Sequence, residues 1–123
     1  MSSFKSQTEQ DIQSTQHMKV EVDINFPRFL EEFEKLEKRE ADLLLKTLSR
    51  IETMTWNDIY RSSSKTAGEK RGINYEPLDS SDRDQSIATI RVTLRFRARV
   101  CRDRRKMILI SLHPDHDSAY TED

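Results

Sequence analysis

Apolar and polar residues alternate in several short stretches of the chain, and this alternation predicts strands. Residues 19–25 carry valine or isoleucine at every second position, which is the pattern of a strand with one buried face. Residues 87–93 and 107–112 are rich in Ile, Val and Leu and predict two further strands. A smaller apolar group at residues 73–78 predicts a short strand between polar loops.

Residues 27–51 follow a helical period instead, with two apolar stripes separated by polar residues 37–40. The stripes are Phe29, Phe33 and Leu36, then Ala41, Leu44, Leu45, Leu48 and Ile51. Pro27 suits the first turn of a helix that has Asn25 or Phe26 near its cap. Periodicity leaves open whether this segment is one long helix or a helical hairpin. Residues 56–60 are compatible with one more helical turn.

Residues 96–101 form the most distinctive predicted strand, because arginine occupies one of its faces. Alternation separates Arg95, Arg97 and Arg99 from Phe96, Ala98 and Val100. A charged turn at residues 103–106 then predicts a hairpin with the strand at 107–112. The element order is β-α-α-β-β-β-β, which indicates an α+β domain.

Length and composition favour a single domain at residues 18–123, preceded by a flexible arm at residues 1–17. The arm is rich in Ser, Gln and Thr and has too few apolar residues to order itself. No apolar run approaches the ~20 residues of a membrane helix, and the N-terminal residues lack the apolar core of a signal peptide. A lone cysteine excludes an internal disulfide. We therefore expect a cytoplasmic protein without membrane partners.

The formal net charge of −1 is unevenly distributed along the chain. Residues 1–60 hold 8 Lys/Arg and 12 Asp/Glu, and residues 111–123 hold none and 4, so each segment sums to −4. Residues 61–110 hold 13 Lys/Arg and 6 Asp/Glu, which sums to +7. This basic block is where a polyanion would bind, although a solvated charged face gives the same pattern.

The last predicted strand is followed by His113, Asp115, His116, Asp117 and Tyr120. Histidine transfers protons near neutral pH, aspartate orients it, and tyrosine donates a proton or stacks on a base. A Pro-containing turn with structural aspartates is the competing interpretation. One short loop rarely surrounds a metal ion, so neither a metal nor a cofactor is expected.

The element order, the strand Phe96-Arg97-Ala98-Arg99-Val100 and a tyrosine soon after the last strand resemble the RelE/ParE superfamily of bacterial toxins. The resemblance covers residues 18–120 and is nearest to RelE- and HigB-type mRNA interferases. It implies a small, twisted, mostly antiparallel sheet with a helical hairpin packed on one face. It therefore favours a break in the helical segment near residues 36–40.

The resemblance also implies a function: the toxin of a type II toxin–antitoxin system that inhibits translation by cleaving mRNA. Cleavage is expected to depend on the ribosome and to need no metal ion. Such an enzyme removes a proton from the RNA 2′-hydroxyl, stabilises the phosphorane and protonates the leaving oxygen. The candidate catalytic residues are Arg97, Arg99, His113, His116 and Tyr120. The candidate substrate contacts are Arg91, Arg95, Asp115 and Asp117.

The site geometry, the partners and the alternative functions can also be predicted. The hairpin should bring the end of the last strand next to Arg97, so that the arginines and histidines meet. A cognate antitoxin should be the protein partner, with mRNA and the ribosome as the other partners. The alternative functions are a gyrase inhibitor of the ParE type and a basic RNA-binding module without catalysis, and an ordinary exposed sheet face would explain Arg97 and Arg99 without either.

Overall fold

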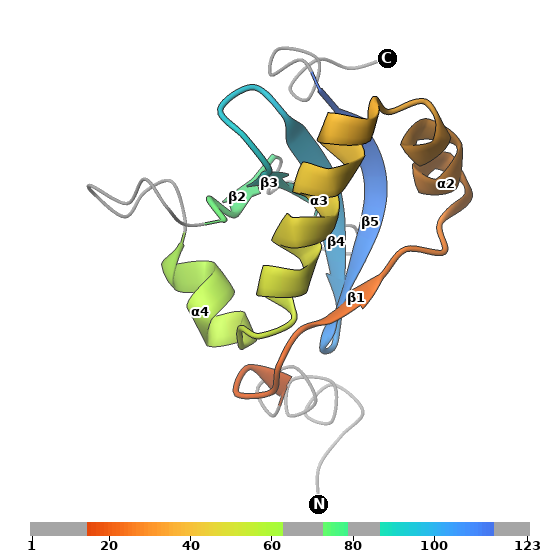
Figure 1. Cartoon of the computed structure of the whole chain (residues 1–123). Helices are drawn as coiled ribbons and strands as arrows, with labels where there is room; N and C mark the ends of the chain where they lie inside the picture. The colour runs from red at the N-terminus through yellow and green to blue at the C-terminus, as the bar shows by residue number, and fades with distance from the viewer. Residues whose placement is uncertain (1–14, 63–72, 79–86, 115–123) are drawn as a thin grey trace, which may run out of the picture.

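The computed structural model describes residues 15–62, 73–78 and 87–114, and in these ranges five strands form one mixed sheet (Figure 1). The strands are β1 (Glu21–Asp23), β2 (Glu76–Pro77), β3 (Ile87–Arg91), β4 (Arg97–Asp103) and β5 (Lys106–His113). Their order across the sheet is β1-β5-β4-β3-β2. Only β1 and β5 run parallel, and the other neighbours are antiparallel. The predicted α+β class and mostly antiparallel sheet are therefore confirmed.

Three helices are described: α2 (Pro27–Glu34), α3 (Lys38–Ile51) and α4 (Trp56–Arg61). Helix α2 begins with Pro27 in its first turn and Phe26 as its N-cap, as the sequence predicts. The helical segment is broken before α3, where Glu37 and Glu40 form a reciprocal capping box. A second capping box, formed by Thr55 and Asp58, starts α4. Each box satisfies backbone N–H groups that a helix start leaves without partners.

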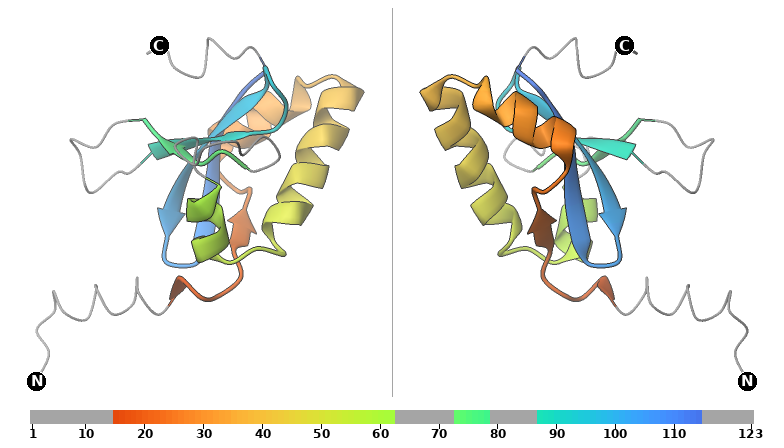
Figure 2. Two further views of the ribbon diagram at one scale, coloured as in Figure 1. Left: turned by 90° about the vertical axis from the view of Figure 1, so that its left-hand side faces the viewer. Right: turned by 90° about the vertical axis from the view of Figure 1, so that its right-hand side faces the viewer.

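The helices α2 and α3 lie at different places on the sheet. Helix α3 crosses one face of the sheet, whereas α2 lies beside β5 at the edge that the short β1 leaves uncovered (Figures 1 and 2). Burial of Phe29 and a hydrogen bond from the Leu112 N–H to Glu32 Oε1, at 2.7 Å, hold α2 there. The expected helical hairpin is present, but α3 rather than the whole hairpin covers the face.

The core lies between α3, α4 and the sheet. Its fully buried members include Leu44, Ile51, Trp56, Ile59, Ile90, Ala98, Val100, Met107 and Leu109. The apolar stripe of α3 and the apolar positions of β3, β4 and β5 thus meet as their periods predict. No helix in the described ranges combines the length and apolar character needed to span a membrane.

At the two edges of the sheet, several backbone N–H groups are either bonded to side chains or absent. The Val22 N–H of β1 donates to Glu52 Oε2 at 3.3 Å. The Leu112 N–H, beyond the end of β1, donates to Glu32 as described above. At the opposite margin, β2 contains Pro77, which has no N–H to donate.

Residues 15–17, the end of the predicted arm, contact the domain. The carbonyl of Gln16 accepts from the Asn57 N–H at 3.1 Å, and the Thr15 hydroxyl accepts from Arg102 Nη2 at 2.8 Å. Thr15 is buried as a result. The chain is therefore attached to the domain from Thr15 onward, earlier than the composition of the arm indicates. Residues 1–14 lie outside the described ranges.

Candidate functional site

Six polar side chains form two rows across the sheet face that points away from α3. The strand register gives one row as Thr89, Arg99 and Ser111, and the next as Arg91, Arg97 and His113. We call these six residues the polar face. Directly opposed residues on neighbouring strands have Cβ atoms about 5 Å apart, so each row brings three polar groups together.

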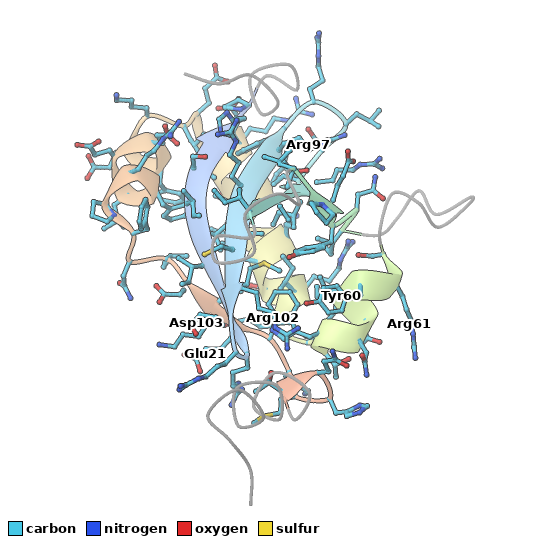
Figure 3. All side chains as sticks on the ribbon, turned by 180° about the vertical axis from the view of Figure 1, so that it is seen from behind. Glu21, Tyr60, Arg61, Arg97, Arg102 and Asp103 are labelled. Carbon is cyan, nitrogen blue, oxygen red and sulfur yellow. The ribbon has the colours of Figure 1, made fainter. Side chains whose placement is uncertain are left out.

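The placement of the polar face follows from the alternation of each strand. Ala88 and Ile90 in β3, and Ala98 and Val100 in β4, belong to the core beneath α3. Their sequence neighbours therefore point to the other side of the sheet. In the view from behind, no described helix lies over β4 and β5, and Arg97 lies near one end of β4 with Arg102 near the other (Figure 3).

A β-bulge aligns β5 with the arginines of β4. Val100 pairs with Leu109 but Arg99 pairs with Ser111, so Ile110 is the extra residue. Without this shift, Ile110 would stand opposite Arg99 and Leu112 opposite Arg97. Because a shift of one residue exchanges the two faces of a strand, the bulge places Ser111 and His113 on the polar face while Leu109 stays in the core.

Ser111 and His113 are joined on this face by a hydrogen bond of 2.8 Å between Oγ and Nε2. Both residues are buried, with exposed fractions of 0% and 4%. A hydroxyl can donate to Nε2 of a neutral imidazole and accept from Nε2–H of an imidazolium. The contact can therefore persist in both charge states of His113.

Arg97 has a structural role that the strand pattern does not reveal. It is only 8% exposed, and its Nη1 donates to the carbonyl oxygens of Thr93 and Leu94 at 2.5 and 3.1 Å. These carbonyls belong to the connection between β3 and β4. Arg97 thus fixes this connection, whereas Arg99, one row further along, is half-buried.

The two other described arginine candidates differ in position. Arg91 lies opposite Arg97, and its guanidinium binds the side-chain oxygen of Asn74, with Nε at 3.1 Å. Asn74 has φ 56°, a left-handed conformation that Asn adopts more readily than most residues. Arg95 is exposed in the connection that precedes β4, where its backbone N–H donates to the Thr93 hydroxyl. Arg95 therefore does not share the face of Arg97 as a strand residue.

The expected meeting of the arginine strand with the end of the last strand is confirmed for Arg97 and His113, which are cross-strand partners. The other candidates of the C-terminal segment, Asp115, His116, Asp117 and Tyr120, lie outside the described residues. Within the described ranges, no three His, Cys, Asp or Glu side chains are grouped as metal ligands would be.

An aromatic cluster that the sequence analysis did not identify surrounds Arg102 at the other end of β4. The Arg102 guanidinium lies over the rings of Trp56 and Tyr60 and donates from Nη1 to the Tyr60 hydroxyl at 2.5 Å. Tyr75 packs edge-on against both rings. Burial, together with the nearby Tyr60, raises the pKa of Tyr75 to about 12. The cluster connects α4 to the sheet, and Tyr75 stays protonated at physiological pH.

Comparisons with known proteins add no relative to this description: no family model, no curated protein and no solved structure matches the chain.

Proposed function

We propose that the chain is the toxin of a type II toxin–antitoxin pair and that it cleaves mRNA without a metal ion. The observation that carries the proposal is the Arg99–Ser111 pair beside the Ser111–His113 hydrogen bond. It combines a permanent cation and a proton-transfer group on one sheet face, as phosphodiester cleavage requires. The resemblance of residues 96–100 and of the element order to RelE- and HigB-type toxins supports the same function.

In the proposed reaction, the RNA 2′-hydroxyl attacks the adjacent phosphorus and the bond to the 5′-oxygen breaks. Arg99 binds the phosphate and stabilises the charge of the phosphorane. His113, as the imidazolium, gives a ring proton to the leaving 5′-oxygen, and its hydrogen bond to Ser111 orients the ring. His116 is the candidate for removing the 2′-hydroxyl proton, and Tyr120 is the candidate for stacking on a base or donating a proton. The products are a 2′,3′-cyclic phosphate and a 5′-hydroxyl.

Arg97 supports this site as a positioning residue. Its guanidinium is occupied by the Thr93 and Leu94 carbonyls, so it holds the β3–β4 connection instead of the phosphate. Arg91, opposite Arg97 and bound to Asn74, supplies a further positive charge for the RNA backbone. The proposed partners are therefore mRNA, in the context of the ribosome, and a cognate antitoxin that covers this face.

A second candidate function is RNA binding without cleavage. The deep burial of His113, at 4% exposed, favours it, because an acid that substrate cannot reach has no catalytic use. In that case the arginines bind phosphate, and affinity falls steeply with salt concentration. Cleavage distinguishes the two functions.

The test is an RNA cleavage assay with the purified full chain, with and without ribosomes, in the presence of a chelator. We expect cyclic-phosphate products from the wild type and a loss of about 10²-fold or more in rate for Arg99→Ala and His113→Ala. Arg39→Ala, at an exposed position of α3, is the matched control and should cleave normally. Wild-type rates in both site variants would contradict the assignment, and salt-sensitive binding without any cleavage would favour the second function.

A further inference from the structure

The connection between β3 and β4, residues 92–96, carries the most exposed large apolar residue of the described ranges. Leu94 is 77% exposed, whereas the other exposed apolar residues of these ranges lie at 46% or below. A single exposed leucine is common on a protein surface. Leu94 differs in two respects, because its loop is held in one conformation and because that loop adjoins the polar face.

Side chains fix the backbone of this loop. The Thr93 N–H donates to the Phe96 carbonyl at 3.2 Å, and the Thr93 hydroxyl accepts from the N–H groups of Arg95 and Phe96 at 3.3 and 3.1 Å. The buried Arg97 guanidinium binds the carbonyls of Thr93 and Leu94. Burial of a charged group is unfavourable unless its donors are satisfied, so the fold uses a buried cation to hold this loop. A loop that is already ordered loses little entropy on binding a ligand.

The loop borders the polar face at the end where His113 lies. Arg97 links the two, because its guanidinium contacts the Leu94 carbonyl and its cross-strand partner is His113. The β3–β4 connection and the end of β5 occupy the same end of the sheet (Figures 1 and 2). An RNA that crosses the polar face at His113 therefore meets this loop next.

The two side chains at the tip of the loop match the two parts of a nucleotide. Arg95 is exposed beside Leu94, and within the described ranges its guanidinium has no hydrogen-bond or ion-pair partner. A guanidinium binds phosphate oxygens, and leucine is one of the apolar side chains that proteins insert between neighbouring bases to unstack them. Unstacking serves the proposed cleavage, because the 2′-hydroxyl, the phosphorus and the leaving oxygen must lie in line, which a regularly stacked strand does not allow.

We propose that Leu94 inserts between two bases next to the cleaved bond and that Arg95 holds an adjacent phosphate. The choice of RNA as the ligand rests on the proposed function, and the insertion adds the means by which the strand is bent for attack. Leu94 is a positioning residue in this account, since it contacts the bases and not the reacting atoms.

The experiment uses short RNAs that carry 2-aminopurine at successive positions and 2′-O-methyl groups, which prevent cleavage. The fluorescence of 2-aminopurine rises when the base loses its stacking neighbours. The wild type should raise the fluorescence at one step of the RNA, and Leu94→Met should do the same because it keeps an apolar side chain. Leu94→Ser should melt like the wild type, because Leu94 is exposed, but should give no rise. It should also cleave unmodified RNA about tenfold more slowly or worse.

Arg95 is tested by the salt dependence of binding. Arg95→Gln should bind the modified RNA more weakly, with a salt dependence reduced by about one phosphate contact. Arg39→Ala, which removes an exposed arginine of α3, is the matched control and should bind and unstack the RNA as the wild type does. An unchanged salt dependence in Arg95→Gln would mean that Arg95 holds no phosphate.

The two readouts separate this inference from the proposed function. If Leu94→Ser unstacks and cleaves RNA as the wild type does, the insertion is wrong and the proposed function stands. The insertion is also wrong if Leu94→Ser loses only the binding of a protein encoded by the neighbouring gene, since Leu94 then serves a protein interface. If the wild type unstacks RNA through Leu94 but cleaves none, the insertion stands and cleavage is wrong. If the wild type binds no RNA, both are wrong.

Discussion

The guanidinium carbon of Arg102 lies 4.5 Å from the centre of the Trp56 ring. The same guanidinium bonds the Tyr60 hydroxyl, the Arg104 carbonyl and the Thr15 hydroxyl. One side chain of β4 therefore joins α4, the β4–β5 turn and the N-terminal segment. These contacts explain how residues 15–17 are attached to the domain without apolar side chains of their own.

Replacing Arg102 should destabilise the domain at this junction. For Arg102→Ala we expect a loss of about 2 kcal/mol in the free energy of unfolding, because a cation–π contact and several hydrogen bonds are lost together. Arg102→Lys keeps the charge but not the planar fork, so it should recover only part of the stability. Chemical denaturation measures both, with Arg39→Ala as the control. If all variants were as stable as the wild type, Arg102 would not stabilise this junction.

Arg97 and Arg99 should differ in what their removal affects. Arg97→Ala leaves the carbonyls of Thr93 and Leu94 without their donor, so the free energy of unfolding should fall by about 1–3 kcal/mol. Arg99→Ala should alter stability less and RNA binding more, with a smaller dependence of binding on salt. Denaturation and binding at two salt concentrations separate these effects. The opposite order, with Arg99 the more important for stability, would exchange the two roles.

The start of α4 should respond to acid through Asp58. The hydrogen bond from the Thr55 N–H holds the pKa of Asp58 below its usual value. A carboxyl with a lowered pKa in the folded state adds stability above its unfolded pKa and loses it as the pH falls through the folded value. Asp58→Ala should therefore cost stability at pH 7 and little at pH 2.

Melting curves of wild type and Asp58→Ala across this pH range measure the difference. Thr55→Ala removes the other half of the capping box and should cost about 1 kcal/mol, with a smaller change between pH 7 and pH 2. A constant difference between wild type and Asp58→Ala at all pH values would mean that the charge of Asp58 does not contribute.

Cys101 should react slowly in the native protein. Burial, together with the nearby Asp103, raises the pKa of the Cys101 thiol, and the thiolate is the reactive form. Iodoacetamide at pH 8 should therefore modify the folded chain more slowly than the chain in denaturant, as mass spectrometry over time would measure. Asp103→Asn should speed the reaction slightly. If the native rate matched the denatured rate, the Cys101 thiol would be accessible and its pKa would not be raised.

The alternation of residues 96–101 and the turn at residues 103–106 were sufficient to predict the arginine strand, the hairpin and the proximity of Arg97 to His113. These features depend on local periodicity, which a sequence displays directly. The Thr55-x-x-Asp58 spacing was also a recognisable capping signal, and it marks the start of α4 more clearly than the apolar residues do.

Other features depend on contacts between distant segments. The bulge at Ile110 adds one residue to β5, and nothing local distinguishes it from an unbroken strand. The parallel pairing of β1 with β5, and the use of the Arg97 guanidinium by Thr93 and Leu94, also follow from the assembled sheet.

The carboxylates of Glu32 and Glu52 occupy backbone donors at one margin of the sheet, and Pro77 removes a donor at the other. A strand from a second molecule needs such donors to join a sheet. The addition of a further strand is therefore opposed at both edges of the sheet, which protects the folded chain against edge-to-edge polymerisation. We therefore expect a protein partner of this chain to engage its faces and helices through side chains, so that specificity is encoded in side-chain chemistry and not in backbone pairing.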